Sequence, residues 1–296
     1  KAPPTAVVAS AAANGPAVAY LAAYMTATDE AHLYYALSVD GFRFDVLVNG
    51  GKPILGATHD DRRLRDPMIL RDRNGIYHLV ATVSWTHRYF TIWDSGDLVT
   101  WANERLVSVA PAGATLVWAP EIAYDAENDQ YFAYWTSATG RFETASIYYA
   151  TTKDFRTFSA PKLLLSDPKA AIMDASIVSD GTRYHMFYRS NGVRHATSTH
   201  ALGPYESPEL VADDDAEGPF VFRLIDGSGW GMVWDYYAGN AGFGLLRSGD
   251  LSTWERITNT TSPYYNARVS FPVGIRHGSI IGVTQAQVDL LRAKGR

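Results

Sequence analysis

The sequence predicts an all-β protein, a five-bladed β-propeller with four antiparallel strands in each blade. Three observations predict this fold: a five-residue phrase that recurs five times, turn signals at a fixed offset after it, and an aromatic content of 13%. The copies of the phrase lie 53, 55, 44 and 59 residues apart. Repeats at intervals of this order indicate propellers or arrays. The copies are Arg65-Asp66-Pro67-Met68-Ile69, Trp118-Ala119-Pro120-Glu121-Ile122, Met173-Asp174-Ala175-Ser176-Ile177, Glu217-Gly218-Pro219-Phe220-Val221 and Arg276-His277-Gly278-Ser279-Ile280.

A hairpin is predicted at the start of each repeat. After the first copy, an apolar run ends at Leu70, Asn74-Gly75 follows, and an aromatic-rich run begins at Tyr77. Asp180-Gly181 and Asp226-Gly227 stand at the corresponding places in later repeats. Asn-Gly and Asp-Gly between apolar runs are strong hairpin signals, because type I′ turns need positive φ at both central residues.

A second phrase of the form Ser/Thr-x-Asp, followed by an aromatic residue, comes after each hairpin. It begins at Ser38, Ser95, Thr152 and Ser248, with a degenerate copy at Thr199. We expect its aspartates to close the turn between the third and fourth strands, with the aromatic residue packed between blades. This role is structural, and it applies to Asp40, Asp97, Asp154 and Asp250.

The two ends of the chain are predicted to complete one blade together. The copy at Ser38 has a strand before it, residues 20–25, but no inner phrase, whereas the phrase at Arg276 has an inner strand, residues 279–283, and nothing after it. Pairing the N-terminal strands with the C-terminal inner strand closes the ring and protects the sheet edges. The predicted organisation is a flexible N-terminal segment (1–16), a propeller catalytic domain (17–284) and a C-terminal tail (285–296) with helical character.

Composition limits the partners. The net charge is −5 without a basic run, which argues against nucleic acid. No apolar stretch approaches the 18 or so residues of a membrane span, so we expect no membrane partner. Zero cysteines exclude disulfides and thiolate catalysis. We expect a monomer, secreted or periplasmic. Residues 1–16 are a linker, the remainder of a processed export signal or a remnant of cloning.

The residues that begin the inner strands are the candidate site. In a propeller these strands line the central channel and enter it from one face, so Asp66, Asp174 and His277 should converge at the channel mouth, with Glu217 one step before Gly218. Singly, each acid is explained by turn chemistry. Their coincidence at equivalent positions of the repeat favours a reaction centre.

In the five copies of the first phrase and the Ser/Thr-x-Asp turns between them, the chain resembles glycoside hydrolase family 43. The members of this family are five-bladed propellers that cleave arabinose- and xylose-containing glycans. The resemblance covers nearly all of residues 17–284. The resemblance implies Asp66 as general base, Glu217 as general acid and Asp174 as the residue that orients the acid and tunes its pKa. Inverting hydrolysis needs an ionised and a protonated carboxyl group about 6.5–9.5 Å apart, and a like charge on Asp174 would raise the pKa of Glu217.

The resemblance also implies an axial histidine at His277, beneath the sugar, which holds either a water molecule or a calcium ion. We expect no required cofactor. Trp85, Trp118 and Arg189 are candidates for holding the sugar by ring stacking or hydrogen bonds, while inter-blade packing is the alternative role for the tryptophans.

The sequence therefore predicts an inverting, exo-acting glycoside hydrolase that releases a terminal pentofuranose, with α-L-arabinofuranosidase favoured and an arabinose-containing oligosaccharide or polysaccharide as substrate. β-Xylosidase, β-galactofuranosidase and endo-arabinanase activities are alternatives on the same scaffold. The five-bladed fructan hydrolases share an Arg-Asp-Pro phrase, but their Asn-Asp-Pro-Asn type motif is absent near the start. A carbohydrate-binding propeller without catalysis is the alternative of another class.

Overall fold

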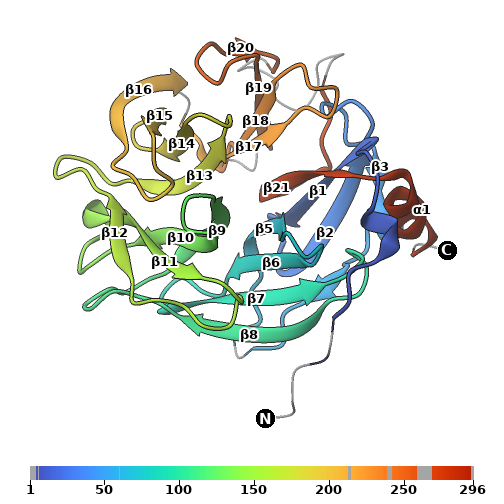
Figure 1. Ribbon diagram of the computed structural model, residues 1–296, viewed down its shortest axis with the longest axis horizontal. Coiled ribbons are helices and arrows are strands. Elements are labelled where there is room, and N and C mark those ends of the chain that lie inside the picture. Colours follow the sequence, from blue (N-terminus) through green and yellow to red (C-terminus); the bar gives the residue numbers. More distant parts are fainter. Residues whose placement is uncertain are drawn as a thin grey trace.

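Five antiparallel sheets surround a central channel in the computed structural model (Figure 1). The structure describes residues 5, 7–59, 61–212, 215–238, 242–258 and 269–294. Each sheet has a four-strand path, and its inner strand carries one copy of the first phrase. The predicted five-bladed propeller is confirmed.

Four blades follow one another along the chain. Blade 1 contains β5 (Arg65–Arg71), β6 (Tyr77–Thr82), β7 (Tyr89–Ser95) and β8 (Ala102–Ser108). Blade 2 contains β9 (Trp118–Asp125), β10 (Gln130–Ser137), β11 (Ser146–Thr152) and β12 (Lys162–Leu165), with a 3-10 turn, η3 (Phe142–Thr144), before β11. Blade 3 contains β13 (Met173–Ser179), β14 (Tyr184–Arg189), β15 (Val193–Ser198) and β16 (Glu206–Ala212). Blade 4 contains β17 (Glu217–Arg223), β18 (Trp230–Asp235), β19 (Phe243–Ser248) and β20 (Glu255–Arg256).

Blade 5 closes the ring with strands from both ends of the chain. β21 (Ile275–Val283) pairs antiparallel with β1 (Ala19–Thr26), which continues to β2 (Asp29–Ser38) and β3 (Val46–Leu47). β4 (Leu55–Gly56) also pairs with β2, and η2 (Val48–Gly51) lies between β3 and β4. The pairing of N-terminal strands with the C-terminal inner strand is as the sequence predicts.

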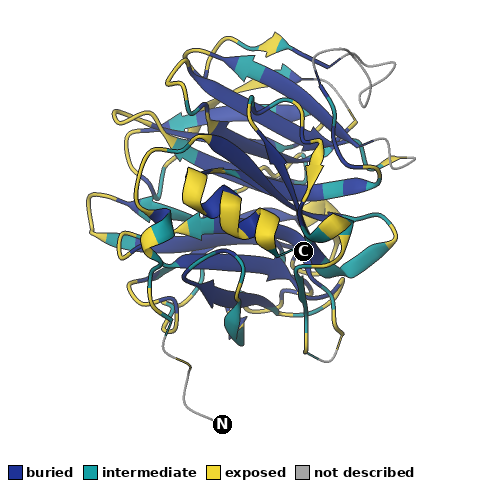
Figure 2. Ribbon diagram, turned by 90° about the vertical axis from the view of Figure 1, so that its right-hand side faces the viewer, coloured by how far each residue is buried: buried dark blue, intermediate teal, exposed yellow. Residues whose placement is uncertain are grey.

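A terminal helix and a 3-10 turn pack against the outside of the ring. Helix α1 (Gln285–Ala293) is capped by Thr284 and buries Val288 and Leu291 while its other face is exposed (Figure 2). The Gln287 side chain donates to the Tyr77 hydroxyl at 2.6 Å, which ties α1 to blade 1. The 3-10 turn η1 (Ala11–Ala13) contacts α1. Within the described residues, no helix is long and apolar enough to cross a membrane.

The second phrase forms the same turn in four blades. The Asp97 carboxylate accepts from the backbone N–H groups of Val99 at 2.8 Å and Thr100 at 2.7 Å, and Ser95 Oγ accepts from the N–H of Leu98 at 2.9 Å. The equivalent bonds are made by Asp40, Asp154 and Asp250. The predicted structural role of these aspartates agrees with this geometry.

The aromatic residue of that phrase reaches the preceding blade. Trp101 donates its indole N–H to the Tyr35 hydroxyl in blade 5 at 3.2 Å. Phe158 lies edge-on to Phe90 with ring centroids 5.9 Å apart, and Trp254 contacts Phe187 at 5.4 Å. These contacts join adjacent blades, since each pair spans two sheets.

A β-bulge interrupts every inner strand where the first phrase begins. Asp66, Ala119, Asp174 and Gly218 all have left-handed backbones, with φ of 52°, 45°, 51° and 57°. The pairing registers shift at these positions and also in β21, next to Arg276. Bulges re-aim side chains, so the repeated strain directs these residues to the mouth of the channel.

Hydrogen bonds between blades hold the bulges in place. Thr82, at the end of β6, accepts from the N–H of Ala119 at 2.7 Å. Thr136, at the equivalent position of β10, accepts from the N–H of Asp174 at 3.0 Å. Asp235, at the end of β18, accepts from the N–H of His277 at 3.1 Å. One position in the second strand of a blade therefore supports the next blade's inner strand.

Candidate active site

A pocket of about 400 Å³ opens at the channel mouth and takes lining residues from all five blades. Every candidate from the sequence lines it: Asp66, Trp85, Trp118, Asp174, Arg189, Glu217 and His277. The structure thus brings the three acids and the histidine together as the repeat predicts. It adds residues that the sequence analysis did not propose for the site, above all Glu30, Arg65, Thr82, Tyr237 and Arg276.

Asp66 is a buried carboxylate with two strong partners. Its Oδ2 accepts from the Thr82 hydroxyl at 2.6 Å, and its Oδ1 lies 3.2 Å from His277 Nδ1. Burial opposes ionisation, but the charge and hydrogen bond of His277, with Arg65 and Thr82, outweigh it and hold the pKa of Asp66 well below its ordinary value. Asp66 is therefore ionised across the neutral and mildly acidic range.

His277 is the cationic partner. Burial disfavours its charge, but the neighbouring Asp66, Asp174 and Glu217 raise its pKa to about 10. Its ring packs against Gly218, where a Cβ atom would lie 2.7 Å from the imidazole. Glycine at that position of the phrase therefore makes room for the histidine, which is a packing reason for one of the differences among the copies.

The pKa of Glu217 is shifted in the opposite direction from the pKa of Asp66. Burial and the negative charge of Asp174 raise the pKa of Glu217 to about 7, against the opposing charge of His277. Arg276 donates to its Oε1 at 3.0 Å. Glu217 can therefore hold a proton near neutral pH while Asp66 is ionised in the same pocket.

Asp174 interacts by charge with both Asp66 and Glu217. Its Oδ2 accepts from the N–H of Gly218 at 3.2 Å, next to Glu217. Burial raises the pKa of Asp174, while His277 lowers it and Asp66 raises it further. Asp174 thus contacts the strand that carries Glu217 and acts on Glu217 by charge.

Asp235 and Arg276 hold Glu217 and His277 by hydrogen bonds. Asp235 is fully buried, and its Oδ2 accepts from both Arg276 Nε and the backbone of His277. Asp235 therefore holds Arg276, which contacts Glu217, and His277, which contacts Asp66. In the sheets, Asp235 lies opposite Glu217 as Thr82 lies opposite Arg65. An alignment of the second strands of the repeats would therefore have pointed to Asp235.

An aromatic wall borders the pocket. Trp85 is 48% exposed and meets Trp118 edge to face with ring centroids 5.6 Å apart, and Trp118 contacts Phe142 at 5.8 Å. The Arg65 guanidinium lies 3.8 Å from the Trp85 ring centroid.

Arg189 lines another part of the pocket. It donates to the Tyr237 hydroxyl at 3.2 Å and pairs with Asp215 at 3.6 Å.

Glu121 is a further acid that the sequence analysis did not single out. It lies on β9 two positions after Ala119, is buried, and accepts from the Tyr134 hydroxyl at 2.7 Å. Burial raises its pKa to about 8. Tyr134 also accepts from the N–H of Ile177 at 2.9 Å, so this pair links blades 2 and 3.

The side chains around His277 do not fit a calcium ion. Calcium takes six to eight oxygen ligands, and among the described residues no group of three or more His, Cys, Asp or Glu is arranged to hold a metal. The Nδ1 atom of His277 faces Asp66, and the pKa of the imidazole is raised.

Similar solved structures share the fold. A putative exo-β-1,3-galactanase from Bifidobacterium bifidum s17 is 13% identical with a TM-score of 0.63, and the match covers 82% of this chain and 89% of that one. The GH62 α-L-arabinofuranosidase of Coprinopsis cinerea is 18% identical with a TM-score of 0.58, over 74% and 77%. A GH43 endo-arabinanase from Bacillus licheniformis is 16% identical with a TM-score of 0.52, over 69% and 78%.

Comparison of sequences identifies the family as well as the fold. An α-L-arabinofuranosidase of Bifidobacterium longum subsp. longum is 24% identical in an alignment 175 residues long, and the match covers 48% of this chain and only 16% of that protein. The family profile of a probable glycosyl hydrolase domain, related to glycoside hydrolase family 43, matches residues 15–289. Because that match spans almost the whole propeller, this chain belongs to the family 43-related glycoside hydrolases.

Proposed function

We propose that this glycoside hydrolase is an inverting, exo-acting enzyme that releases a terminal pentofuranose, and that it is an α-L-arabinofuranosidase. The observation that carries the acid and base assignment is that two carboxyl groups lining one pocket have pKa values shifted in opposite directions. The pKa of Asp66 is held low by His277, while burial and Asp174 raise that of Glu217 to about 7. Paired titratable groups with divergent pKa values identify an acid and a base.

In the proposed mechanism, ionised Asp66 accepts a proton from a water molecule as that water attacks the anomeric carbon. Protonated Glu217 gives its proton to the glycosidic oxygen, and the leaving sugar departs as an alcohol. Thr82 and His277 orient the two oxygens of Asp66, and Arg276 contacts Oε1 of Glu217. Asp174 acts by charge on Glu217. Trp85, Trp118 and Arg189 hold the sugar from the rim.

The sugar is proposed from the relatives. The Bifidobacterium longum and Coprinopsis cinerea proteins are named α-L-arabinofuranosidases, which supports arabinofuranose. The Bifidobacterium bifidum structure is named an exo-β-1,3-galactanase, so galactose is the sugar to test against it.

Two measurements test the proposal. Hydrolysis of 4-nitrophenyl α-L-arabinofuranoside should exceed that of the matched β-xyloside, β-galactoside and β-galactofuranoside by at least tenfold. Proton NMR of the first-formed sugar should show inverted configuration. Faster cleavage of another glycoside would replace the sugar, and a retained anomer would refute the base role of Asp66.

A further inference from the structure

The Arg276 side chain joins two carboxyl groups. Its Nε atom donates to Oδ2 of Asp235 at 2.5 Å, and its Nη2 atom donates to Oε1 of Glu217 at 3.0 Å. Glu217 lines the active-site pocket, whereas Asp235 is fully buried. One guanidinium group therefore connects the proposed acid to a carboxyl group that is closed off from solvent.

An arginine beside a general acid poses an electrostatic problem. A neighbouring cation favours the ionised carboxylate and commonly lowers its pKa by about 1–3 units. Against burial, His277 and Arg65 lower the pKa of Asp66 in this way, which suits a base. Arg276 is in hydrogen-bond contact with Glu217, yet the pKa of Glu217 is raised to about 7, with burial as the first cause. The charge of Arg276 must therefore be offset by another group.

The two arginines differ in the anion beside them. Glu30 lies 3.7 Å from Arg65 and itself lines the pocket. Asp235 lies 2.5 Å from Arg276 and is fully buried, where solvent and salt screen an ion pair least. Besides burial, the charge of Asp235 is one of those that raise the pKa of Glu217. Asp235 is therefore placed to offset the charge of Arg276.

The charges at this end of β21 balance when Glu217 holds its proton. His277 then pairs with Asp66 at 3.2 Å, and Arg276 pairs with Asp235. Burial raises the pKa of Asp235, but Arg276 and the N–H of His277 both donate to its Oδ2 and oppose this. Were Asp235 neutral, Glu217 would be the remaining carboxyl group in contact with Arg276 and would ionise.

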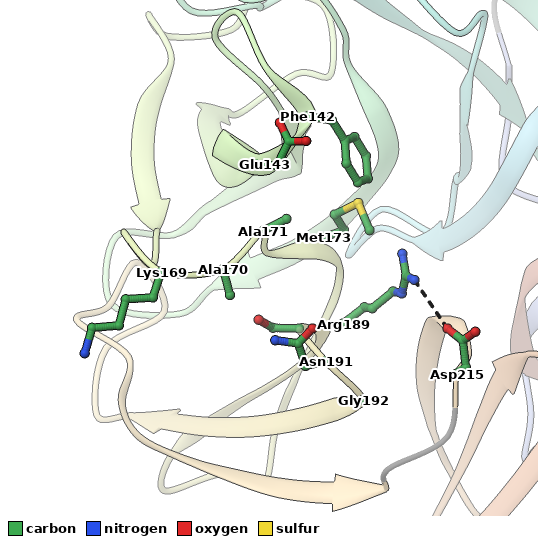
Figure 3. A pocket seen from close by; sticks show the side chains of 11 residues that line it. Phe142, Glu143, Lys169, Ala170, Ala171, Met173, Arg189, Asn191, Gly192 and Asp215 are labelled. Atoms are coloured by element: carbon green, nitrogen blue, oxygen red, sulfur yellow. Dashed lines mark ion pairs between the residues drawn. The ribbon is translucent and has the colours of Figure 1, made fainter.

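Other groups around this cluster have partners of their own. Arg189 points toward Asp215 and pairs with it at 3.6 Å (Figure 3), and Tyr237 donates to Asp215 at 2.9 Å. Within the described parts of the chain, Arg276 forms ion pairs with Asp235 and Glu217 alone. The charged and titratable groups that face the cluster are Asp66 on β5, Asp174 on β13, Arg189 on β14, Tyr237 after β18 and His277 on β21.

We infer that Asp235 is a positioning residue for the general acid: its carboxylate offsets the charge of Arg276, so that Arg276 holds Glu217 in place without drawing off its proton. The inference rests on the proposed function and deepens it, because it assigns the group that lets an arginine and a protonated acid share one contact. Asp235 acts through Arg276 and does not touch the substrate.

The test separates acid catalysis from structure by means of the leaving group. Phenol leaves a glycoside efficiently only with a proton from the acid, whereas 2,4-dinitrophenolate leaves without one. Asp235→Asn keeps one acceptor oxygen for the N–H of His277 but removes the charge beside Arg276. At pH 8, a fall of about 1 unit in the pKa of Glu217 lowers its protonated fraction about tenfold.

We therefore expect a selective loss in Asp235→Asn. At pH 8, kcat/KM for phenyl α-L-arabinofuranoside should fall at least tenfold, while kcat/KM for the 2,4-dinitrophenyl glycoside stays within threefold of the unchanged enzyme. The loss should be smaller at pH 5, where a larger share of Glu217 is protonated in both proteins. A purely structural defect would lower both substrates alike at either pH.

A double variant tests whether the charge of Arg276 is the cause. Arg276→Gln added to Asp235→Asn removes both charges, so the ratio of the two kcat/KM values should return toward that of the unchanged enzyme. Asp125→Asn is the matched control. Asp125 is also buried, accepts from Asn128 and Gln130, and ends β9 far from Trp118 at the pocket. This control should keep both substrates within twofold.

Several outcomes would overturn the inference. Equal losses on the two substrates would leave Asp235 a structural role only, and unchanged values would show that it carries no charge in the folded enzyme. A double variant as selective as Asp235→Asn would exclude the charge of Arg276 as the cause. If Asp235→Asn does not fold, Arg276→Gln alone decides. The charge of Asp235 then acts on Glu217 unopposed, so the alkaline limb of kcat/KM for the phenyl glycoside should move up, and a limb that stays or moves down contradicts the inference.

Failure of the proposed function gives a different result. Glu217→Gln should slow the phenyl glycoside far more than the dinitrophenyl glycoside. If it slows both alike, Glu217 is not the acid, and the proposed mechanism fails together with the inference. If Glu217→Gln is selective and Asp235→Asn is not, the inference alone fails. If the unchanged enzyme cleaves neither arabinofuranoside, the proposed sugar is wrong, and the same pair of aryl glycosides is made with the sugar that it does cleave.

Discussion

Aspartate recurs in two regions of the propeller, the outer turns and the channel mouth, and the two regions use it differently. In the turns, Asp40, Asp154 and Asp250 each accept two backbone N–H groups, and their pKa values lie below the ordinary range although burial acts against this for Asp40 and Asp154. At the mouth, Asp66 and Asp174 have different partners and opposite shifts of pKa. Copies that share their partners serve the scaffold, and copies that differ can serve chemistry.

The largest expected effect is a loss of kcat/KM on substitution at the channel mouth but not in the outer turns. Glu217→Gln removes the proposed acid, so kcat/KM toward an unactivated disaccharide should fall about 10²–10⁴-fold, the usual contribution of general acid catalysis. Asp250→Asn, in a turn, should stay within twofold. Steady-state kinetics with both variants measures the contrast, and comparable losses in the two would contradict it.

The same glutamine variant should not lose stability. The pKa of Glu217 is raised to about 7 in the folded protein, so stability declines as pH rises from the unfolded carboxyl value, near 4.5, to about 7. At pH 8 the variant is free of this cost, and its free energy of unfolding in urea should equal or exceed that of the unchanged protein.

The next effect concerns pH. Because Glu217 must be protonated and Asp66 ionised, kcat/KM should fall as pH rises above about 7 and show no acidic decline until well below pH 4. Asp174→Asn removes a negative charge beside Glu217, lowers its pKa, and should move the alkaline limb down by roughly 1 pH unit. Asp40→Asn is the matched turn variant and should leave the profile in place. An unmoved or upward-shifted limb for Asp174→Asn would exclude charge as the role of Asp174.

The smallest effect falls on stability alone. Asp97→Ala takes the acceptor from the N–H groups of Val99 and Thr100, but water reaches this outer turn, so the loss should be about 1 kcal/mol. Asp97→Asn keeps one acceptor oxygen and should cost less. Urea denaturation measures both, and an accompanying tenfold loss of kcat/KM would show that the turn and the mouth are not independent.

The repeated phrases in the sequence predicted the structural features that recur from blade to blade. The five inner strands, the turn aspartates and the closing of blade 5 follow from patterns that recur, because each copy faces the same packing problem. The convergence of Asp66, Asp174 and His277 was also predictable, since equivalent positions of a ring face one another.

Contacts specific to one blade could not be predicted in this way. The stacking of Arg65 on Trp85 and the link between Arg189, Tyr237 and Asp215 join strand residues to residues outside the strands, and the repeated phrases carry no information on those side-chain directions. Asp235 differs, because its register position is shared with Thr82 and Thr136. Aligning the second strands, rather than only the inner ones, would have found it.

Closure of the ring by β21 has a consequence for biosynthesis. Arg276 and His277 are on the last strand to leave the ribosome in this stretch of chain, and they reach the pocket only when β21 pairs with β1. A nascent or truncated chain that ends before β21 lacks the cation that pairs with Asp66 and the arginine that contacts Glu217. The reaction centre can therefore assemble only after β21 has been synthesised and has paired with β1.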